Sequence, residues 1–167
     1  MKTLGLCLRK SCTFLTFSVS VLVFLTCAVL FAQNAKIMNS TGTWKLNMEK
    51  SHSSEKGPPP NGAVLKIVHK EPAYKYSYTE TSADGKTSTV EFDGVIDGKP
   101  YKQPDGTTAT LKRMNDSTLG GTSTSADGKT TEESTWVISK DGKVGTYEST
   151  SKGSEGVKTT LLVFEKQ

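Results

Sequence analysis

Cysteine and histidine are scarce in this sequence. The three cysteines, Cys7, Cys12 and Cys27, all lie near the start of the chain, and only two of the 167 residues are histidines. The chain beyond Cys27 therefore has no disulfide, no thiol nucleophile and no thiolate metal site. His52 and His69 show no metal-ligand spacing, and we expect both to be solvated. The sequence predicts neither a metal site nor a cofactor.

Recognisable catalytic motifs are also missing. The sequence contains no Gly-x-Ser-x-Gly elbow, no phosphate-binding loop and no dinucleotide fingerprint. Its Asp-Gly pairs are explained by turn geometry, and none has the further carboxylates that a calcium site requires. We therefore predict that the protein is not an enzyme.

A long apolar run occurs once, at residues 13–31. It follows a short basic segment that contains Lys2, Arg9 and Lys10, and it ends at the small residue Ala32. This arrangement predicts that residues 1–32 are a signal peptide and that the protein is secreted or periplasmic. The alternative is an uncleaved membrane anchor, because the run is close to the ~20 residues that span a bilayer. We expect no other contact with a membrane.

An excess of charge is absent once this leader is set aside. Removing its three basic residues from the 21 lysines and arginines leaves 18 against 17 acidic residues, so the net charge falls from +4 to +1. A near-neutral chain with interspersed charges has no basic patch for nucleic acid. We expect a monomer without a nucleic-acid partner.

Tight-turn signals are abundant in the remaining chain. The stretch 81–87, Thr-Ser-Ala-Asp-Gly-Lys-Thr, recurs letter for letter at 124–130. Asp-Gly suits the left-handed backbone of a hairpin turn, so both copies predict hairpin tips. At the first tip, a three-residue loop pairs Tyr76 with Phe92 and Tyr78 with Val90, which places aromatic and β-branched side chains together.

The second tip leaves two registers open. One pairs Leu119 with Trp136, whereas the other sets Trp136 opposite Thr118. The pair Gly120-Gly121 is a candidate position for a β-bulge.

Nine short strands and no helix are predicted. In residues 42–48, for example, Trp44, Leu46 and Met48 alternate with polar residues, as in a sheet with one buried face. Consecutive hairpins predict an all-β, antiparallel up-and-down meander that closes into an eight-to-ten-stranded barrel, because closure removes exposed edges. A two-sheet sandwich is the alternative. We expect residues 33–41 to be a flexible tail and 42–167 to be a single barrel domain.

The segment Gly42-Thr43-Trp44-Lys45-Leu46 resembles the Gly-x-Trp signature on the first strand of lipocalins. The whole layout is similar to that of small secreted lipocalin-like proteins of bacteria. This resemblance implies a calycin-type barrel in which Trp44 plugs one end. The family's usual partner of that tryptophan is an arginine near the last strand, but the only arginine outside the leader is Arg113, in mid-chain. The Arg-x-Tyr pair that holds a fatty-acid carboxylate is absent, so the resemblance implies the fold more than the ligand.

Three tyrosines on one strand face form the candidate binding site. Tyr74, Tyr76 and Tyr78 share a face that Glu80 continues, and an inward orientation would make this face an aromatic wall. The alternative is that the three rings are core packing whose hydroxyls reach the rim. The residues that we expect to bind a ligand are Tyr74, Tyr76, Tyr78, Phe92, Arg113 and Trp136.

Three functions are compatible with these features. The favoured one is an exported, non-catalytic barrel that binds a small amphipathic or hydrophobic molecule. The second is a structural or protein-binding envelope module whose barrel is filled by side chains. The third is a lipocalin-like enzyme that uses tyrosine, glutamate and Arg113 for acid and base chemistry.

Overall fold

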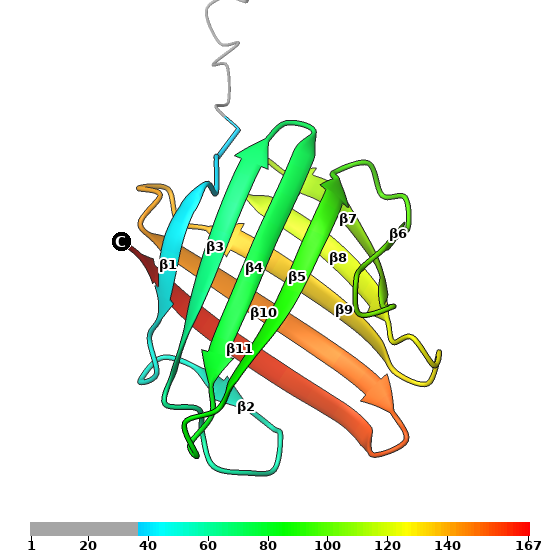
Figure 1. Ribbon diagram of the computed structural model, residues 1–167. Helices are drawn as coiled ribbons and strands as arrows, with labels where there is room; N and C mark the ends of the chain where they lie inside the picture. The colour runs from blue at the N-terminus through cyan, green and yellow to red at the C-terminus, as the bar shows by residue number, and fades with distance from the viewer. Residues whose placement is uncertain (1–36) are drawn as a thin grey trace, which may run out of the picture. The chain divides into compact units, whose positions relative to one another are not determined.

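The computed structural model describes residues 37–167, which form one antiparallel sheet of eleven strands (Figure 1). The predicted signal peptide lies outside the described residues. No helix that could cross a membrane occurs in the part that is described. The strands are β1 (Gly42–Leu46), β2 (His52–Ser53), β3 (Gly62–Lys70), β4 (Ala73–Thr81), β5 (Thr87–Val95), β6 (Tyr101–Lys102), β7 (Thr108–Asn115), β8 (Thr118–Thr124), β9 (Thr131–Ile138), β10 (Val144–Gly153) and β11 (Gly156–Lys166).

The sheet curls into a nearly closed barrel. Hydrogen-bonded neighbours follow the order β5-β4-β3-β1-β11-β10-β9-β8-β7-β6, and β2 pairs with β11. In Figure 1, β1, β3, β4 and β5 form one wall, and β7 to β11 cross behind them as the other. The predicted up-and-down meander is therefore confirmed. The nine predicted strands are the nine longer ones, and β2 and β6 are two-residue additions.

The barrel is left open along the seam between β5 and the pair β6 and β7. A side chain bridges this seam where backbone pairing stops: Gln103 accepts a hydrogen bond from the Asp93 backbone N–H at 2.9 Å and donates one to the Tyr101 carbonyl at 2.9 Å. Gln103 is buried, and its side-chain amide supplies hydrogen bonds that these two backbone groups do not receive from a neighbouring strand.

Alternation of buried and exposed residues builds the core. Along β3, Ala63, Leu65 and Ile67 are buried, whereas Val64 and Lys66 are exposed. The period of two puts the buried set on the inner face of the barrel. The buried apolar residues are Trp44, Leu46, Ala63, Leu65, Ile67, Tyr74, Phe92, Leu119, Trp136, Ile138 and Phe164.

The first hairpin has the predicted register. Tyr76 pairs with Phe92 and Tyr78 with Val90. The Ser82 backbone N–H donates to the Lys86 carbonyl, which encloses a three-residue loop, and Gly85 has a φ of 82° as the predicted turn requires.

The second hairpin differs from the first although its tip has the same sequence. Leu119 pairs with Trp136, and the Ser125 N–H donates to the Thr130 carbonyl, so this loop has four residues. The bulge lies elsewhere than expected. Met114, between Arg113 and Asn115, is the extra residue, and the ladder at Gly120-Gly121 continues without a shift.

Candidate functional site

One end of the barrel is closed around Trp44. This side chain is 0% exposed, and its indole N–H donates to the Ser40 carbonyl at 2.9 Å. The Trp136 ring meets it edge to face, with 5.4 Å between the ring centroids. The Met38 backbone N–H donates to the Asp116 carbonyl in the β7–β8 turn. Residues 38–41, assigned to the tail by sequence, therefore pack against the end of the barrel.

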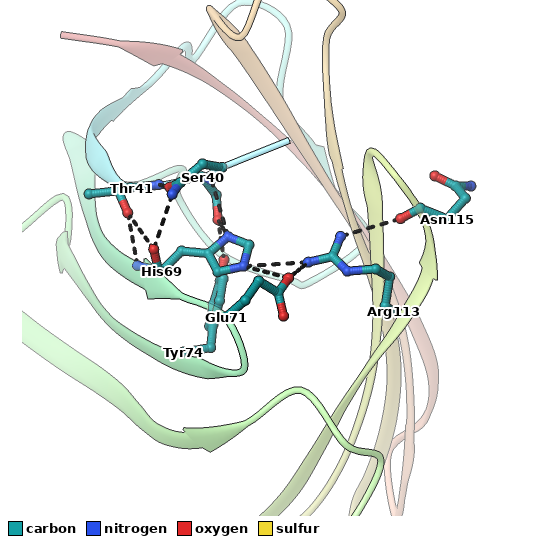
Figure 2. A network of polar contacts seen from close by, with 8 residues as sticks. Ser40, Thr41, His69, Glu71, Tyr74, Arg113 and Asn115 are labelled. Carbon is teal, nitrogen blue, oxygen red and sulfur yellow. Dashed lines mark hydrogen bonds and ion pairs between the residues drawn. The ribbon is translucent and has the colours of Figure 1, made fainter. Parts of the chain in front are cut away.

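A polar network, which we call the closed-end network, lies beside this plug and consists of Ser40, His69, Glu71, Tyr74 and Arg113 (Figure 2). The Ser40 backbone N–H donates to His69 Nδ1 at 3.3 Å, which places the ring proton on Nε2. His69 Nε2 donates to Glu71 Oε1 at 2.9 Å. Only 2% of His69 is exposed, so the expectation of a solvated histidine is wrong for this residue.

Arg113 reaches the closed-end network from the opposite wall. Its guanidinium forms an ion pair with Glu71, which ties β7 to the β3–β4 turn. Partial burial opposes ionisation of Glu71, but hydrogen bonds from His69 and Arg113 outweigh it and hold the carboxyl pKa below its usual value. Arg113 therefore belongs to the same network as Tyr74 and Glu71. It does not lie beside Glu80, which is at the other end of the tyrosine face.

The order of hydroxyl, imidazole and carboxylate in this network resembles a catalytic relay, but the geometry does not provide a nucleophile. Ser40 is 0% exposed, and its hydroxyl donates to the Tyr74 hydroxyl at 3.2 Å. No substrate carbonyl can reach a fully buried Ser40 Oγ in this arrangement. The network is best understood as satisfied polar groups that lock the closed end.

The other half of the interior has a different lining, which we call the open-half lining. On one wall, its inward residues are Tyr76, Tyr78 and Glu80 of β4. On the other wall, they are Glu132 and Ser134 of β9 and Tyr147 and Ser149 of β10, which pair across these two strands or share their inner face. Val90 belongs to the same face as Tyr78, yet 47% of its surface is exposed. Because β5 borders the open seam, the exposed Val90 makes this part of the inner face accessible to solvent.

The tyrosine hydroxyls of the open-half lining are held in their neutral form. Burial and, to a smaller extent, the negative charges of Glu132 and Asp105 together raise the pKa of Tyr76 to about 12. Burial also raises the pKa of Tyr147, whose hydroxyl donates to Glu132 Oε1 at 2.5 Å. Tyr78 donates to Glu80 Oε2 at 2.8 Å, and its pKa is likewise raised, first by burial.

The predicted site residues are divided between these two regions. Tyr76 and Tyr78 line the open half, where the Tyr76 ring stacks on buried Phe92 with 5.6 Å between centroids. Tyr74 and Arg113 belong to the closed-end network. Trp136 is buried against Trp44, and its indole N–H has no hydrogen-bond partner within residues 37–167.

Sequence reasoning did not name Glu132 or Tyr147 as site residues. Once Trp136 faces inward, the period of two along β9 makes Ser134 and Glu132 inward as well, and the β9–β10 pairing sets Tyr147 beside Trp136. A charged residue on an otherwise apolar inward face is not expected from the pattern of buried residues, which is why Glu132 carries no signal of its own in the sequence.

A shallow groove of about 770 Å³ lies on the outer face of β7 to β11. Its lining combines threonines with charged residues, among them Lys112, Glu133 and Glu148, whose positions alternate with the inward ones. Most of its lining positions are outward, but the lining also includes Gly121, Ser134 and Ser149, whose positions are inward.

Comparisons with known proteins show similarity at the level of structure alone. No family model and no curated protein matches the sequence. Zebrafish ileal bile acid-binding protein, solved with cholic acid, aligns at 17% identity and a TM-score of 0.46 over 77% of this chain and all of its own. A fatty acid binding protein of Schistosoma mansoni, solved with arachidonic acid, aligns at 15% identity and 0.47 over 78% and 98% of the chains. The S-type phycobiliprotein lyase CPES of Guillardia theta aligns at 12% identity and 0.43 over 77% and 88%. The described chain has a lipocalin-like barrel, as its nearly closed antiparallel meander indicates.

Proposed function

We propose that this protein is an exported, non-catalytic barrel that binds a small amphipathic molecule in the open half of its interior. Val90 carries the proposal, because it faces inward beside Tyr78 and is 47% exposed. A valine in a filled barrel would lose nearly all of its accessible surface, since its burial is favourable. A ligand can recover that burial energy.

The open-half lining favours an amphipathic ligand over a long acyl chain. Tyr76 and Tyr78 offer ring faces on one wall, and Gly121, Ser134 and Ser149 occupy inward positions on the other. Small residues opposite aromatic ones leave room for a ring, and the hydroxyls supply hydrogen-bonding partners for a polar group.

The predicted signal peptide supports export as part of this proposal. The folded region contains no cysteine, so it needs no disulfide to fold outside the reducing cytoplasm. Its stability rests on the core around Trp44 and Phe164, which is complete at the end opposite the open half.

Titration with the uncharged fluorescent probe N-phenyl-1-naphthylamine tests the binding function. We expect saturable fluorescence enhancement. Ser149→Phe, which fills the interior, should weaken binding by at least about tenfold, or roughly 1.4 kcal/mol. Thr150→Phe is the matched control, since the neighbouring residue on β10 faces the outer surface. No saturable binding at any probe concentration, or equal losses in both variants, would contradict the proposal.

A protein-binding role is a second candidate, and the groove on the outer face of β7 to β11 favours it. In that case Thr150→Phe, which adds a ring on the outer face, would abolish capture of a partner from the envelope fraction. Ser149→Phe, whose ring points inward, would weaken capture far less although Ser149 also borders the groove. This pair of variants therefore separates the two functions.

A further inference from the structure

The open half of the barrel interior has a negative character. Glu80 and Glu132 both occupy inward positions, on β4 and β9 respectively. Neither carboxylate forms an ion pair with a basic residue in the range 37–167. Each instead accepts a hydrogen bond from a neutral tyrosine, Tyr78 for Glu80 and Tyr147 for Glu132.

The basic groups nearest the interior have partners elsewhere. Lys158 shares a row with Glu132 through Ser151, but its ammonium contacts Glu155 at 2.7 Å and Glu55 at 3.6 Å. Arg113 pairs with Glu71 in the closed-end network, and the Lys166 ammonium lies over the Trp44 ring. Within the described chain, no cation is therefore directed at Glu132.

Tyr76 lies on the same inner face of the barrel as Glu132 and Tyr147. It comes from the opposite wall, and its hydroxyl makes no hydrogen bond to another residue of the range 37–167. Its pKa, raised to about 12 first by burial and then by the charge of Glu132, is consistent with a position deep in the barrel and close to that carboxylate. The Tyr147 hydroxyl donates a hydrogen bond to Glu132 Oε1, whereas Oε2 accepts none from the described residues.

We infer that the ligand of this barrel is a basic amphiphile, a protonated amine on an aromatic or short apolar body, with Glu132 as its counter-ion. This inference rests on the proposed binding function. An unpaired carboxylate in a partly desolvated interior attracts a cation and repels a second carboxylate. The stacked Tyr76 and Phe92 rings add faces that also favour a nearby cation.

Three probes with one naphthyl body and different head groups test the charge preference by calorimetric titration. They are 1-naphthylmethylamine, 1-naphthylmethanol and 1-naphthylacetate. We expect the amine to bind at least about tenfold more tightly than the carboxylate, with the alcohol between them, since a close ion pair distinguishes the three. The preference should decrease in high salt.

Glu132→Gln should remove the preference for the amine over the alcohol, with a loss of about tenfold in amine affinity. Glu133→Gln is the matched control, because the adjacent residue faces the outer surface. A near-ultraviolet circular dichroism spectrum establishes that each variant is folded, and Glu80→Gln provides a second interior variant should Glu132→Gln be unstable.

The outcomes separate the two proposals. Equal binding of all three probes, tighter binding of the carboxylate, or an unchanged amine affinity in a folded Glu132→Gln protein would overturn the amine inference but retain a binding barrel. Failure of every probe, the alcohol included, would overturn the binding function itself.

Discussion

The Lys166 ammonium lies 5.1 Å from the ring centroid of Trp44. Lys166 is the last residue of β11 and pairs with Trp44 of β1, so the contact joins the first and last strands of the sheet in chain order. The resemblance to lipocalins implies an arginine near the last strand as the partner of this tryptophan, and here the residue at that place is Lys166. An ammonium over an indole face is attracted by the ring quadrupole, so this contact stabilises the closed end of the barrel.

Trp44→Ala should destabilise the fold by about 3–5 kcal/mol, the usual cost of deleting a large buried aromatic side chain. Denaturant melts measure this change. Thr43→Ala, on the outward face of the same strand, should cost far less. Equal small effects would show that Trp44 does not anchor the core.

Lys166→Met should cost about 0.5–1 kcal/mol in the same melts, because the apolar stem is retained and only the cation over the ring is lost. Lys45→Met serves as the control, since Lys45 is exposed on the outward face of β1. If both variants behave alike, the contact with Trp44 contributes no stability.

Glu71→Gln should weaken the fold in a pH-dependent way. The pKa of Glu71 in the folded protein lies below its ordinary value of 4.5, so its ionised form stabilises the fold above pH 4.5. That contribution is lost as the pH falls from 4.5 through the lower pKa of the folded state. Because Glu71 is 42% exposed, we expect less than about 1 kcal/mol at neutral pH.

Urea melts of wild type and Glu71→Gln across this pH range measure the effect. The two curves should converge at acid pH. Glu91→Gln, an exposed glutamate on β5, is the control. A stability difference that grows on acidification would contradict the assigned role of Glu71.

Gly145→Ala should destabilise the barrel by about 1–3 kcal/mol, the usual cost of overpacking. An added Cβ at Gly145 would overlap the six-membered ring of Trp136, which lies against this glycine. Thermal melts measure the change, with Thr146→Ala as the neighbouring variant. An unchanged melting temperature for Gly145→Ala would mean that Trp136 can move aside without cost.

The exported protein should begin at or close to Gln33, following cleavage after Ala32. Mass spectrometry of the protein from its own host measures the mature N-terminus. Recovery of an intact species of residues 1–167 from the membrane fraction would instead favour the uncleaved anchor.

Local sequence patterns were sufficient for the strands and for most of the topology. The alternation of Trp44 and Leu46 with polar residues, and the Asp-Gly tips, act within a few residues of chain, so they are readable without a structure. The register of the first hairpin could also be predicted. Only the three-residue loop places the large apolar side chains Tyr76, Tyr78, Val90 and Phe92 on one face.

The second hairpin required the folded barrel. Its seven-residue tip is identical to the first, yet it forms a four-residue loop. A three-residue loop would pair Trp136 with Thr118 and turn Leu119 outward, because a shift of one residue exchanges the faces. Burial of Leu119 and Trp136 against the core therefore selects the loop.

The site depended on contacts between distant segments in the same way. His69 is buried because residues 38–41 cover it, and Arg113 meets Glu71 because β7 and the β3–β4 turn converge at one end. Glu132 reaches Tyr147 through the pairing of β9 with β10. Strand identity is set by neighbours along the chain, which a sequence displays, whereas the partner of a charged side chain is set by how the sheet curls.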